Sequence, residues 1–345
     1  MRKLFIQLKL VRWPAALLLA IFVITGCQQT REEIRAVQGL TMGTSYSVKW
    51  VSKDVDTQKV HAAIEAVLKD INQSMSTYIE TSELSRLNQS SSTEWQPLSS
   101  ALYDVLRLST DLSTQTDGAF DVTVGPLVNL WGFGPEGRVV TAPSDDTIEA
   151  ERNRVGFEKI ALNATDQQIK KSVAELYIDL SAVAKGYAVD RVASLLEEFG
   201  YERYLVEIGG ELRAKGLKPG GKHWRIAIET PDAATRSVQK IINVKDVAIA
   251  TSGDYRNYFE ENGVRFSHTI DPSTGKPIRH RLASVTVFAA SCAEADALAT
   301  AFMVMGTERG VKYAMQHRIN ALFINKGDTG FEEIMTPGFK KYLAN

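Results

Sequence analysis

The stretch of sequence that decides the fold runs from Tyr204-Leu-Val-Glu-Ile208 to Ser284-Val-Thr-Val-Phe-Ala289. Between them, β-branched and aromatic residues gather in short runs, which predict strands at 204–208, 224–229, 241–250, 266–270 and 284–289. The strands follow one another and do not alternate strictly with helices, which favours an α+β fold over a doubly wound one. We therefore predict an α+β fold with a largely antiparallel sheet, packed helices and a single large domain.

Further elements are predicted on both sides of this stretch. One helix is indicated by apolar residues at helical spacing, namely Val60, Ile64, Leu68, Ile71 and Met75. Other helices are predicted at 99–114, 183–199, 293–305 and 307–316, with Gly200 as a plausible C-cap of the helix at 183–199. Further strands are predicted at 41–51, 176–180, 319–324 and 331–335. Residues 131–147, rich in Gly, Pro and Asp, form a predicted loop.

The N-terminus is typical of a bacterial lipoprotein signal. Four positive residues precede an apolar run at 15–25, which is shorter than the roughly 20 residues that span a bilayer. The run ends in Ile24-Thr-Gly-Cys27, which resembles a lipobox and predicts lipidation of Cys27; a signal anchor with an incidental cysteine is the alternative. We expect a signal peptide at 1–26, a tether at 27–38 and a globular domain at 39–345. The domain would lie on the periplasmic side of the inner or the outer membrane.

Charge and cysteine content argue against several classes of site. Without the signal, 36 Lys and Arg residues oppose 41 Asp and Glu residues, a net charge of −5, and no basic run of five residues occurs. Nucleic acid is therefore not an expected partner. Cys292 is the only other cysteine, so a lipidated Cys27 leaves no internal disulfide. The sequence has no CxxC motif, which excludes a thiol-redox or zinc-thiolate site of that kind.

Four segments hold Gly, Asp and Thr at positions where packing does not require them. In the first, Asp117-Gly-Ala119-Phe120-Asp121, a glycine turn beside an apolar wall could hold a planar ring, although an ordinary helix-to-loop turn is the alternative. The second, Tyr177-Ile-Asp179-Leu-Ser181-Ala182, precedes a predicted helix whose N-terminus, with Lys185, suits a phosphate. Asp179 or Ser181 could instead be the N-cap of that helix.

The third segment joins residues 250–255 to Phe266-Ser-His268-Thr-Ile270-Asp271 and a Pro-Ser-Thr-Gly turn. On one strand, His268 and Ile270 would face the same side, and a functional and a structural role for His268 are about equally expected. In the fourth, Asp296 and Thr300 lie four residues apart on one helical face among small apolar residues. Such a pair can hold Mg²⁺, which prefers oxygen ligands. A solvated polar stripe is the alternative, but an unpaired Asp would be costly to bury.

Taken together and in this order, the four segments resemble the ApbE family of FAD:protein FMN transferases. The resemblance covers the whole mature chain, including Met42-Gly-Thr44, Met75-Ser-Thr-Tyr78 and Gly209-Gly-Glu211. It implies an ApbE-like transferase domain that uses FAD as substrate and Mg²⁺ as cofactor. The implied reaction moves the FMN moiety of FAD onto a Thr or Ser hydroxyl of a target protein and releases AMP.

The resemblance also implies roles for individual residues. By position, the FAD contacts would be Met42, Tyr78, Ala119, Phe120, Asp121, Asp179, Lys185 and Ile270. Asp296 and Thr300 match the metal ligands of the family, and Ala182 matches a position whose backbone carbonyl binds the metal. Some members carry a second Asp where this chain has Ala299, which leaves the number of carboxylates at the metal open. For the general base, His268 and Asp271 are both candidates.

Two other functions fit the same residues. A Mg²⁺-dependent FAD pyrophosphatase would use the site with water as acceptor, and a non-catalytic lipoprotein would only bind FAD. The resemblance implies membrane redox subunits with a Thr or Ser flavinylation motif as partners. No such motif is evident in this chain, so self-flavinylation is not expected.

Overall fold

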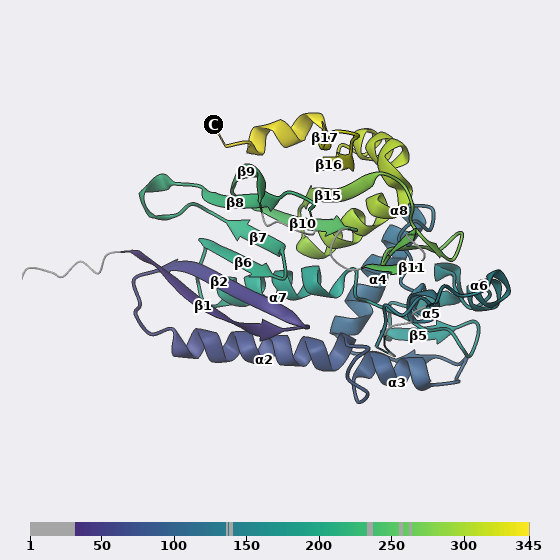
Figure 1. The fold of residues 1–345 in the computed structure, drawn as a ribbon. Helices are drawn as coiled ribbons and strands as arrows, with labels where there is room; N and C mark the ends of the chain where they lie inside the picture. The colour runs from purple at the N-terminus through teal and green to yellow at the C-terminus, as the bar shows by residue number, and fades with distance from the viewer. Residues whose placement is uncertain are drawn as a thin grey trace, which may run out of the picture.

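The computed structural model describes residues 32–135, 137, 141–232, 237–254, 258–261 and 264–344. Its centre is an antiparallel sheet with the order β1-β2-β6-β7-β10-β15-β16-β17, drawn in Figure 1. These strands are β1 (Glu33–Thr41), β2 (Thr44–Ser52), β6 (Tyr204–Ile208), β7 (Glu211–Lys215), β10 (Val247–Gly253), β15 (Leu282–Ala289), β16 (Asn320–Lys326) and β17 (Phe331–Met335). The predicted α+β fold with a largely antiparallel sheet is confirmed.

Helices cover one face of this sheet and enclose the larger core. They are α2 (Gln58–Met75), α4 (Ser100–Gln115), α7 (Ala184–Glu198) and α8 (Cys292–Gln316). The predicted inward residues of α2 are all buried. Gly200, at φ +82°, ends α7, and the Tyr201 amide bonds the Leu196 carbonyl at 2.9 Å, which is the predicted glycine C-cap.

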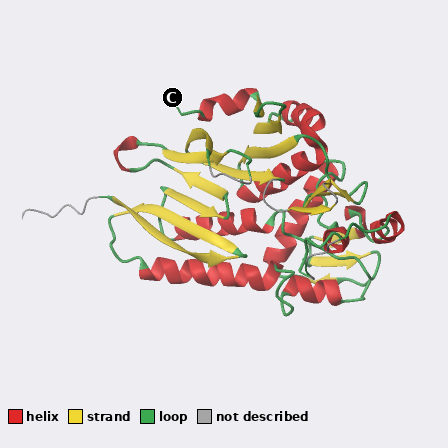
Figure 2. Ribbon diagram, viewed as in Figure 1, coloured by secondary structure: helices red, strands yellow, loops and turns green. Residues whose placement is uncertain are grey.

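The opposite face of the sheet carries a smaller core. A hairpin of β8 (Trp224–Glu229) and β9 (Val238–Val244) packs there with the 3₁₀ helix η3 (Pro337–Tyr342). The 3₁₀ helix η2 (Pro219–Gly221) precedes β8. Figure 2 shows the resulting layers, with strands between the red helices below and the short C-terminal helix above.

A side unit lies at one end of the sheet, at the right of Figure 1. Within it, Trp131, Phe259 and Phe266 form an aromatic stack, with 5.4 Å between the ring centroids of Trp131 and Phe266. Other buried residues of the unit, namely Leu84, Leu87 and Ile169, pack in the larger core. Its helices are α3 (Glu83–Gln89), α5 (Gly125–Leu130), α6 (Asp145–Arg152) and the 3₁₀ helix η1 (Phe157–Lys159). Its strands are β3 (Gln96–Pro97), β4 (Ile160–Asn163), β5 (Gln168–Lys171), β11 (Tyr258–Glu261), β12 (Val264–Ser267), β13 (Ile270–Asp271) and β14 (Lys276–Pro277).

The long helix α8 is broken at Gly306, whose φ of +72° and ψ of 179° are not helical. His280 Nε2 donates a hydrogen bond of 2.7 Å to the Met303 carbonyl just before the break. The two helices predicted at 293–305 and 307–316 are therefore the two halves of α8.

Several predicted boundaries are wrong for identifiable reasons. The predicted tether at 27–38 includes the first part of β1, because this edge strand buries few side chains and its polar residues resemble a linker. The range predicted as one strand, 41–51, includes the last residue of β1 and a turn at Met42 and Gly43, which both have positive φ; the strand β2 begins only at Thr44 and pairs with β1. The strand predicted at 241–250 is two strands, because Asp246 has a φ of +51° between β9 and β10.

The segment at 176–180, predicted as a strand, pairs with no strand of the described sheets. The Asn88 side chain takes the position that a partner strand would have. It hydrogen-bonds both the amide and the carbonyl of Ile178, at 2.9 and 2.8 Å. The Asp179 amide bonds the Val122 carbonyl at 2.7 Å. The segment is thus held by individual hydrogen bonds and not by a strand ladder.

The predicted signal at 1–26 and Cys27 lie outside the described residues. Among the residues that the structure describes, every helix is too short or too polar to span a bilayer.

Candidate active site

A cavity of about 440 Å³ opens where the end of the sheet meets α7, α8 and the side unit. It is lined by nearly all the predicted site residues from segments far apart in the sequence: Tyr78, Ala119, Phe120, Asp121, Asp179, Ala182, Lys185, His268, Ile270, Asp296 and Thr300. The four segments singled out in the sequence therefore meet in one place.

Met42 and the alternative base Asp271 are the exceptions among the described residues, since neither lines the cavity, and Met42 packs against the main core. Thr44, two residues on, lies against the turn at Gly209. The β1–β2 turn that carries Met42 therefore lies next to the β6–β7 turn, where the Gly209 amide donates a hydrogen bond of 3.0 Å to the Ser45 carbonyl.

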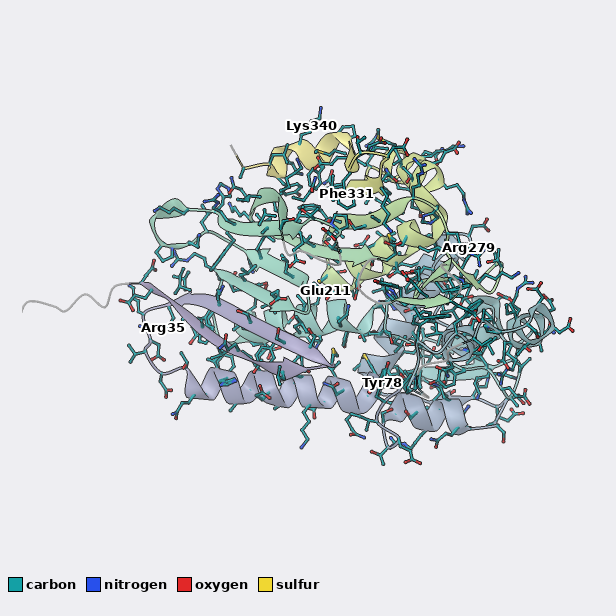
Figure 3. All side chains as sticks on the ribbon, viewed as in Figure 1. Arg35, Tyr78, Glu211, Arg279, Phe331 and Lys340 are labelled. Atoms are coloured by element: carbon teal, nitrogen blue, oxygen red, sulfur yellow. The ribbon has the colours of Figure 1, made fainter. Side chains whose placement is uncertain are left out.

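Three charged side chains meet at the base of the cavity. Lys185 Nζ donates a hydrogen bond of 2.7 Å to Glu211 Oε1 and lies 3.7 Å from Asp296 Oδ2. Asp296 and Glu211 are only 3% and 4% exposed. Figure 3 places Glu211 near the centre of the molecule and Tyr78 near the end of α2. Two buried carboxylates thus share one ammonium group, which leaves an excess negative charge.

The pKa values of this cluster reflect both its burial and its charges. Burial raises the pKa of Asp296 to about 7; Lys185 opposes this shift and Glu211 adds to it. Burial would lower the pKa of Lys185, but the charges of Asp296 and Glu211 outweigh burial and raise it. A second cation beside Asp296 would therefore be stabilised.

The oxygen donors near Asp296 suit a hard cation. Thr300 lies one helical turn further along α8, and its Oγ1 is 3.3 Å from Ser252 Oγ on β10. Ala182 also lines the cavity. Within the described ranges, no three His, Cys, Asp or Glu side chains are grouped as a metal site. Mg²⁺ needs no such group, because it is commonly bound by one or two carboxylates together with water and substrate phosphates.

The N-terminus of α7 is used differently from the sequence prediction. Val183 is its N-cap and makes no side-chain capping bond, so neither Asp179 nor Ser181 is the cap. Asp179 Oδ1 instead accepts hydrogen bonds from the amide and hydroxyl of Ser181, at 2.8 and 2.5 Å. The first-turn amide of Gly186 donates to Asp296 Oδ2 at 3.1 Å. This amide of the helix N-terminus therefore stabilises a carboxylate, and Lys185 remains the candidate ligand for a phosphate.

The turn that precedes α5 forms an apolar wall of the cavity. Ala119 and Phe120 line it and are buried. Asp121 Oδ1 accepts from the amide and hydroxyl of Thr123, at 2.8 and 2.7 Å, and Oδ2 accepts from the Phe157 amide at 3.0 Å. Both oxygens of Asp121 thus hold the turn itself. Tyr78 is 69% exposed at the mouth, where an aromatic ring can cover a ligand.

His268 lines the cavity from a position between two strands, and not from within one strand as predicted. β12 ends at Ser267 and β13 begins at Ile270, so His268 and Ile270 do not share one strand as expected. Both nevertheless line the cavity, and the His268 ring packs edge-on against Phe133 at 6.3 Å. Asp271 Oδ1 accepts from the amide and hydroxyl of Ser273, at 2.9 and 2.7 Å. Asp271 therefore stabilises the next turn, and His268 is the better candidate base.

Three further polar residues, Glu211, Ser252 and Thr269, line the cavity together with several apolar residues, and the sequence predicts no individual role for them. The sole sequence signal of Glu211 is a carboxylate after two glycines at the start of a strand.

Comparison with known proteins places this geometry in a family. The model of the ApbE family matches residues 42–323. An FAD:protein FMN transferase of Vibrio cholerae is 47% identical over 334 residues, which cover 96% of this chain and 99% of that protein. The FAD:protein FMN transferase of Escherichia coli K12 is 39% identical over 340 residues, covering 96% and 97%.

Solved structures agree in fold and in sequence. The flavin transferase ApbE from Vibrio cholerae superposes with a TM-score of 0.84 at 47% identity, covering 91% of this chain and all of that one. The ApbE protein from Thermotoga maritima has a TM-score of 0.81 at 31% identity, again covering 91% and 100%. The chain therefore belongs to the ApbE family.

Proposed function

We propose that this protein transfers the FMN moiety of FAD to a Thr or Ser hydroxyl of a target protein and releases AMP. The observation that carries the proposal is the make-up of the cavity, which Lys185, Asp296 and Thr300 line together with the aromatic residues Tyr78 and Phe120. Such a cavity offers rings for a flavin and charge for a pyrophosphate. Relatives named FAD:protein FMN transferase support the same activity.

Asp296, Thr300 and the Ala182 carbonyl would hold Mg²⁺. The excess negative charge at Asp296 and Glu211 favours a cation there. When bound, Mg²⁺ would act as a Lewis acid on a phosphate oxygen.

The other groups of the site would bind and orient FAD. The Lys185 ammonium can bind a phosphate oxygen while Glu211 holds it in place. Ala119 and Phe120 offer an apolar surface to the isoalloxazine ring, and the exposed ring of Tyr78 can cover its outer side. Positioning and charge stabilisation are the main requirements of phosphoryl transfer.

His268 would accept the proton of the acceptor hydroxyl. That oxygen forms a bond to the phosphorus that carries riboflavin, and the bond from this phosphorus to AMP breaks. The products are AMP and a phosphodiester that joins FMN to the target protein. Histidine suits this role because it exchanges protons near neutral pH.

The test is incubation of the purified protein with FAD, Mg²⁺ and a candidate acceptor peptide. AMP is measured by chromatography and peptide-bound flavin by mass spectrometry. Transferase activity gives equal amounts of AMP and flavinylated peptide. AMP with free FMN would indicate an FAD pyrophosphatase, and FAD binding without AMP would indicate a binding protein.

We also propose that Cys27 anchors the protein by a lipid on the periplasmic side of a bacterial membrane. Its sequence context supports this role, and membrane redox subunits with a Thr or Ser flavinylation motif would then lie within reach. Mass spectrometry of the mature N-terminus tests the anchor. An unmodified N-terminus on membrane-extracted protein would contradict it.

A further inference from the structure

Glu211 presents a charge that its structural role does not explain. The residue is 4% exposed at the start of β7, and one oxygen binds Lys185. Among the described residues, its other oxygen, Oε2, is buried and has no hydrogen-bond partner. A buried carboxylate oxygen without a partner is costly, so the sequence tolerates a destabilising group beside the active site.

The backbone around Glu211 fixes where this carboxylate lies. Gly209, at φ +64°, has no side chain, and a Cβ there would lie 2.8 Å from the Thr44 side chain and 3.5 Å from Glu211 Oε2. The turn is thus closely packed between Thr44 and Glu211. Because the turn is confined, the Glu211 carboxylate is held in place among the residues that line the cavity.

Lys185 has two possible carboxylate partners and contacts them unequally. Its ammonium makes a hydrogen bond of 2.7 Å to Glu211 but only a longer ion pair, at 3.7 Å, with Asp296 Oδ2. Without Glu211, Asp296 would be the remaining carboxylate near the ammonium. A shorter, hydrogen-bonded Lys185–Asp296 pair would then neutralise more fully the carboxylate that the proposed function assigns to the cation.

We propose that Glu211 is a positioning residue that draws the Lys185 ammonium away from Asp296 and so keeps Asp296 available to a divalent cation. Glu211 acts on the cation through Lys185 and not as a ligand. Only the cation site at Asp296 is taken from the proposed function.

Direct cation binding tests this role without any flavin reaction. The probe is Mn²⁺, titrated into the metal-free protein and followed by electron paramagnetic resonance in the absence of FAD. Glu211→Gln should weaken Mn²⁺ binding about tenfold, because the ammonium then pairs with Asp296. Glu211→Asp should weaken it similarly although it retains the charge, because the shorter side chain no longer reaches Lys185.

The double variant Lys185→Met/Glu211→Gln decides the mechanism. If Glu211 acts through Lys185, removal of the ammonium restores Mn²⁺ affinity to at least the wild-type level. A double variant that binds as weakly as Glu211→Gln, or a Glu211→Asp variant that binds like wild type, would overturn the inference. Thermal melting of each metal-free variant checks its fold, and Lys185→Met alone should bind Mn²⁺ more tightly than wild type.

Failure of the proposed function is recognised separately. Loss of the transferase reaction in an enzyme that binds Mn²⁺ would contradict the proposed function and leave the inference standing. Wild-type protein that binds no Mn²⁺ would contradict both.

Discussion

Gly186 packs closely against α8 and also donates a hydrogen bond to Asp296. Its replacement by alanine therefore tests whether the packing of the two helices affects the site. A Cβ at Gly186 would lie 2.4 Å from the Cys292 carbonyl oxygen and 2.8 Å from the Ala293 Cα, where an ordinary contact is at least 3.4 Å. These are backbone atoms of α8, so they cannot rotate aside. Gly186→Ala must therefore push α7 and α8 apart by about 1 Å at this point.

The free-energy change follows from three effects. Overpacking costs about 1–3 kcal/mol. Separation of the helices also stretches the 3.1 Å hydrogen bond from the Gly186 amide to Asp296, and loss of a hydrogen bond to a charged group costs about 1.5–3 kcal/mol. Alanine gains about 1 kcal/mol of helix propensity over glycine. We expect a net destabilisation of about 1.5–5 kcal/mol and weaker binding of Mg²⁺.

Urea denaturation measures the first effect and Mg²⁺ titration the second. Gly310→Ala, also in α8, is the matched control, since a Cβ there would meet the Phe323 side chain at 2.9 Å and no backbone atom at such close range. We expect it to destabilise the protein by about 1–3 kcal/mol, because the buried Phe323 ring must shift. It should leave the Mg²⁺ affinity unchanged, because Gly310 makes no contact with Asp296. A Gly186→Ala protein with wild-type stability and Mg²⁺ affinity would refute the reasoning.

The remaining predictions concern individual site residues. Asp296→Ala should reduce Mg²⁺-dependent AMP release by about 10³-fold or more in a folded protein, since a metal supplies several kcal/mol of charge stabilisation; undiminished turnover would exclude Asp296 as a ligand. Thr300→Ala should be milder in the same assay, because a neutral hydroxyl contributes less than a carboxylate. His268→Asn should slow transfer about 10²–10⁴-fold with little change in FAD affinity; a pH–rate curve that keeps its acidic limb would rule out His268 as the base. Cys27→Ser should block lipidation and signal cleavage, as judged by the N-terminal mass, while a soluble form that begins near residue 29 keeps its activity.

Elements with a repeating apolar pattern could be predicted from the sequence. The helix α2 buries one regular stripe, and the break in α8 coincides with a glycine. The strand boundaries at Met42 and Asp246 could not be predicted, because residues other than glycine rarely adopt positive φ and local sequence does not signal it. The strand prediction at 176–180 is wrong because the hydrogen-bond partner of Ile178 is the side chain of Asn88, 90 residues away, and not another strand.

Site residues that are close in sequence could be predicted to lie together, whereas those brought together by tertiary packing could not. Asp296 and Thr300 are one helical turn apart, so sequence spacing alone brings them together. The link from Lys185 to Glu211 joins a helix to a strand 26 residues later, and only the folded chain shows it. Asp121 and Asp271 are similar residue types in similar turns, yet their carboxylates bind neighbouring backbone groups, which a sequence motif does not reveal.

The break at Gly306 also has a consequence for how this protein can change in evolution. In a continuous helix, insertion of one residue rotates everything beyond it by about 100°. Asp296 and Thr300 lie before the break, and residues after it form a separate helical half that ends at Gln316. A length change in that second half would therefore alter its own packing but leave the orientation of the two site residues intact. Insertions and deletions should be tolerated between residues 307 and 316 far better than between 292 and 305.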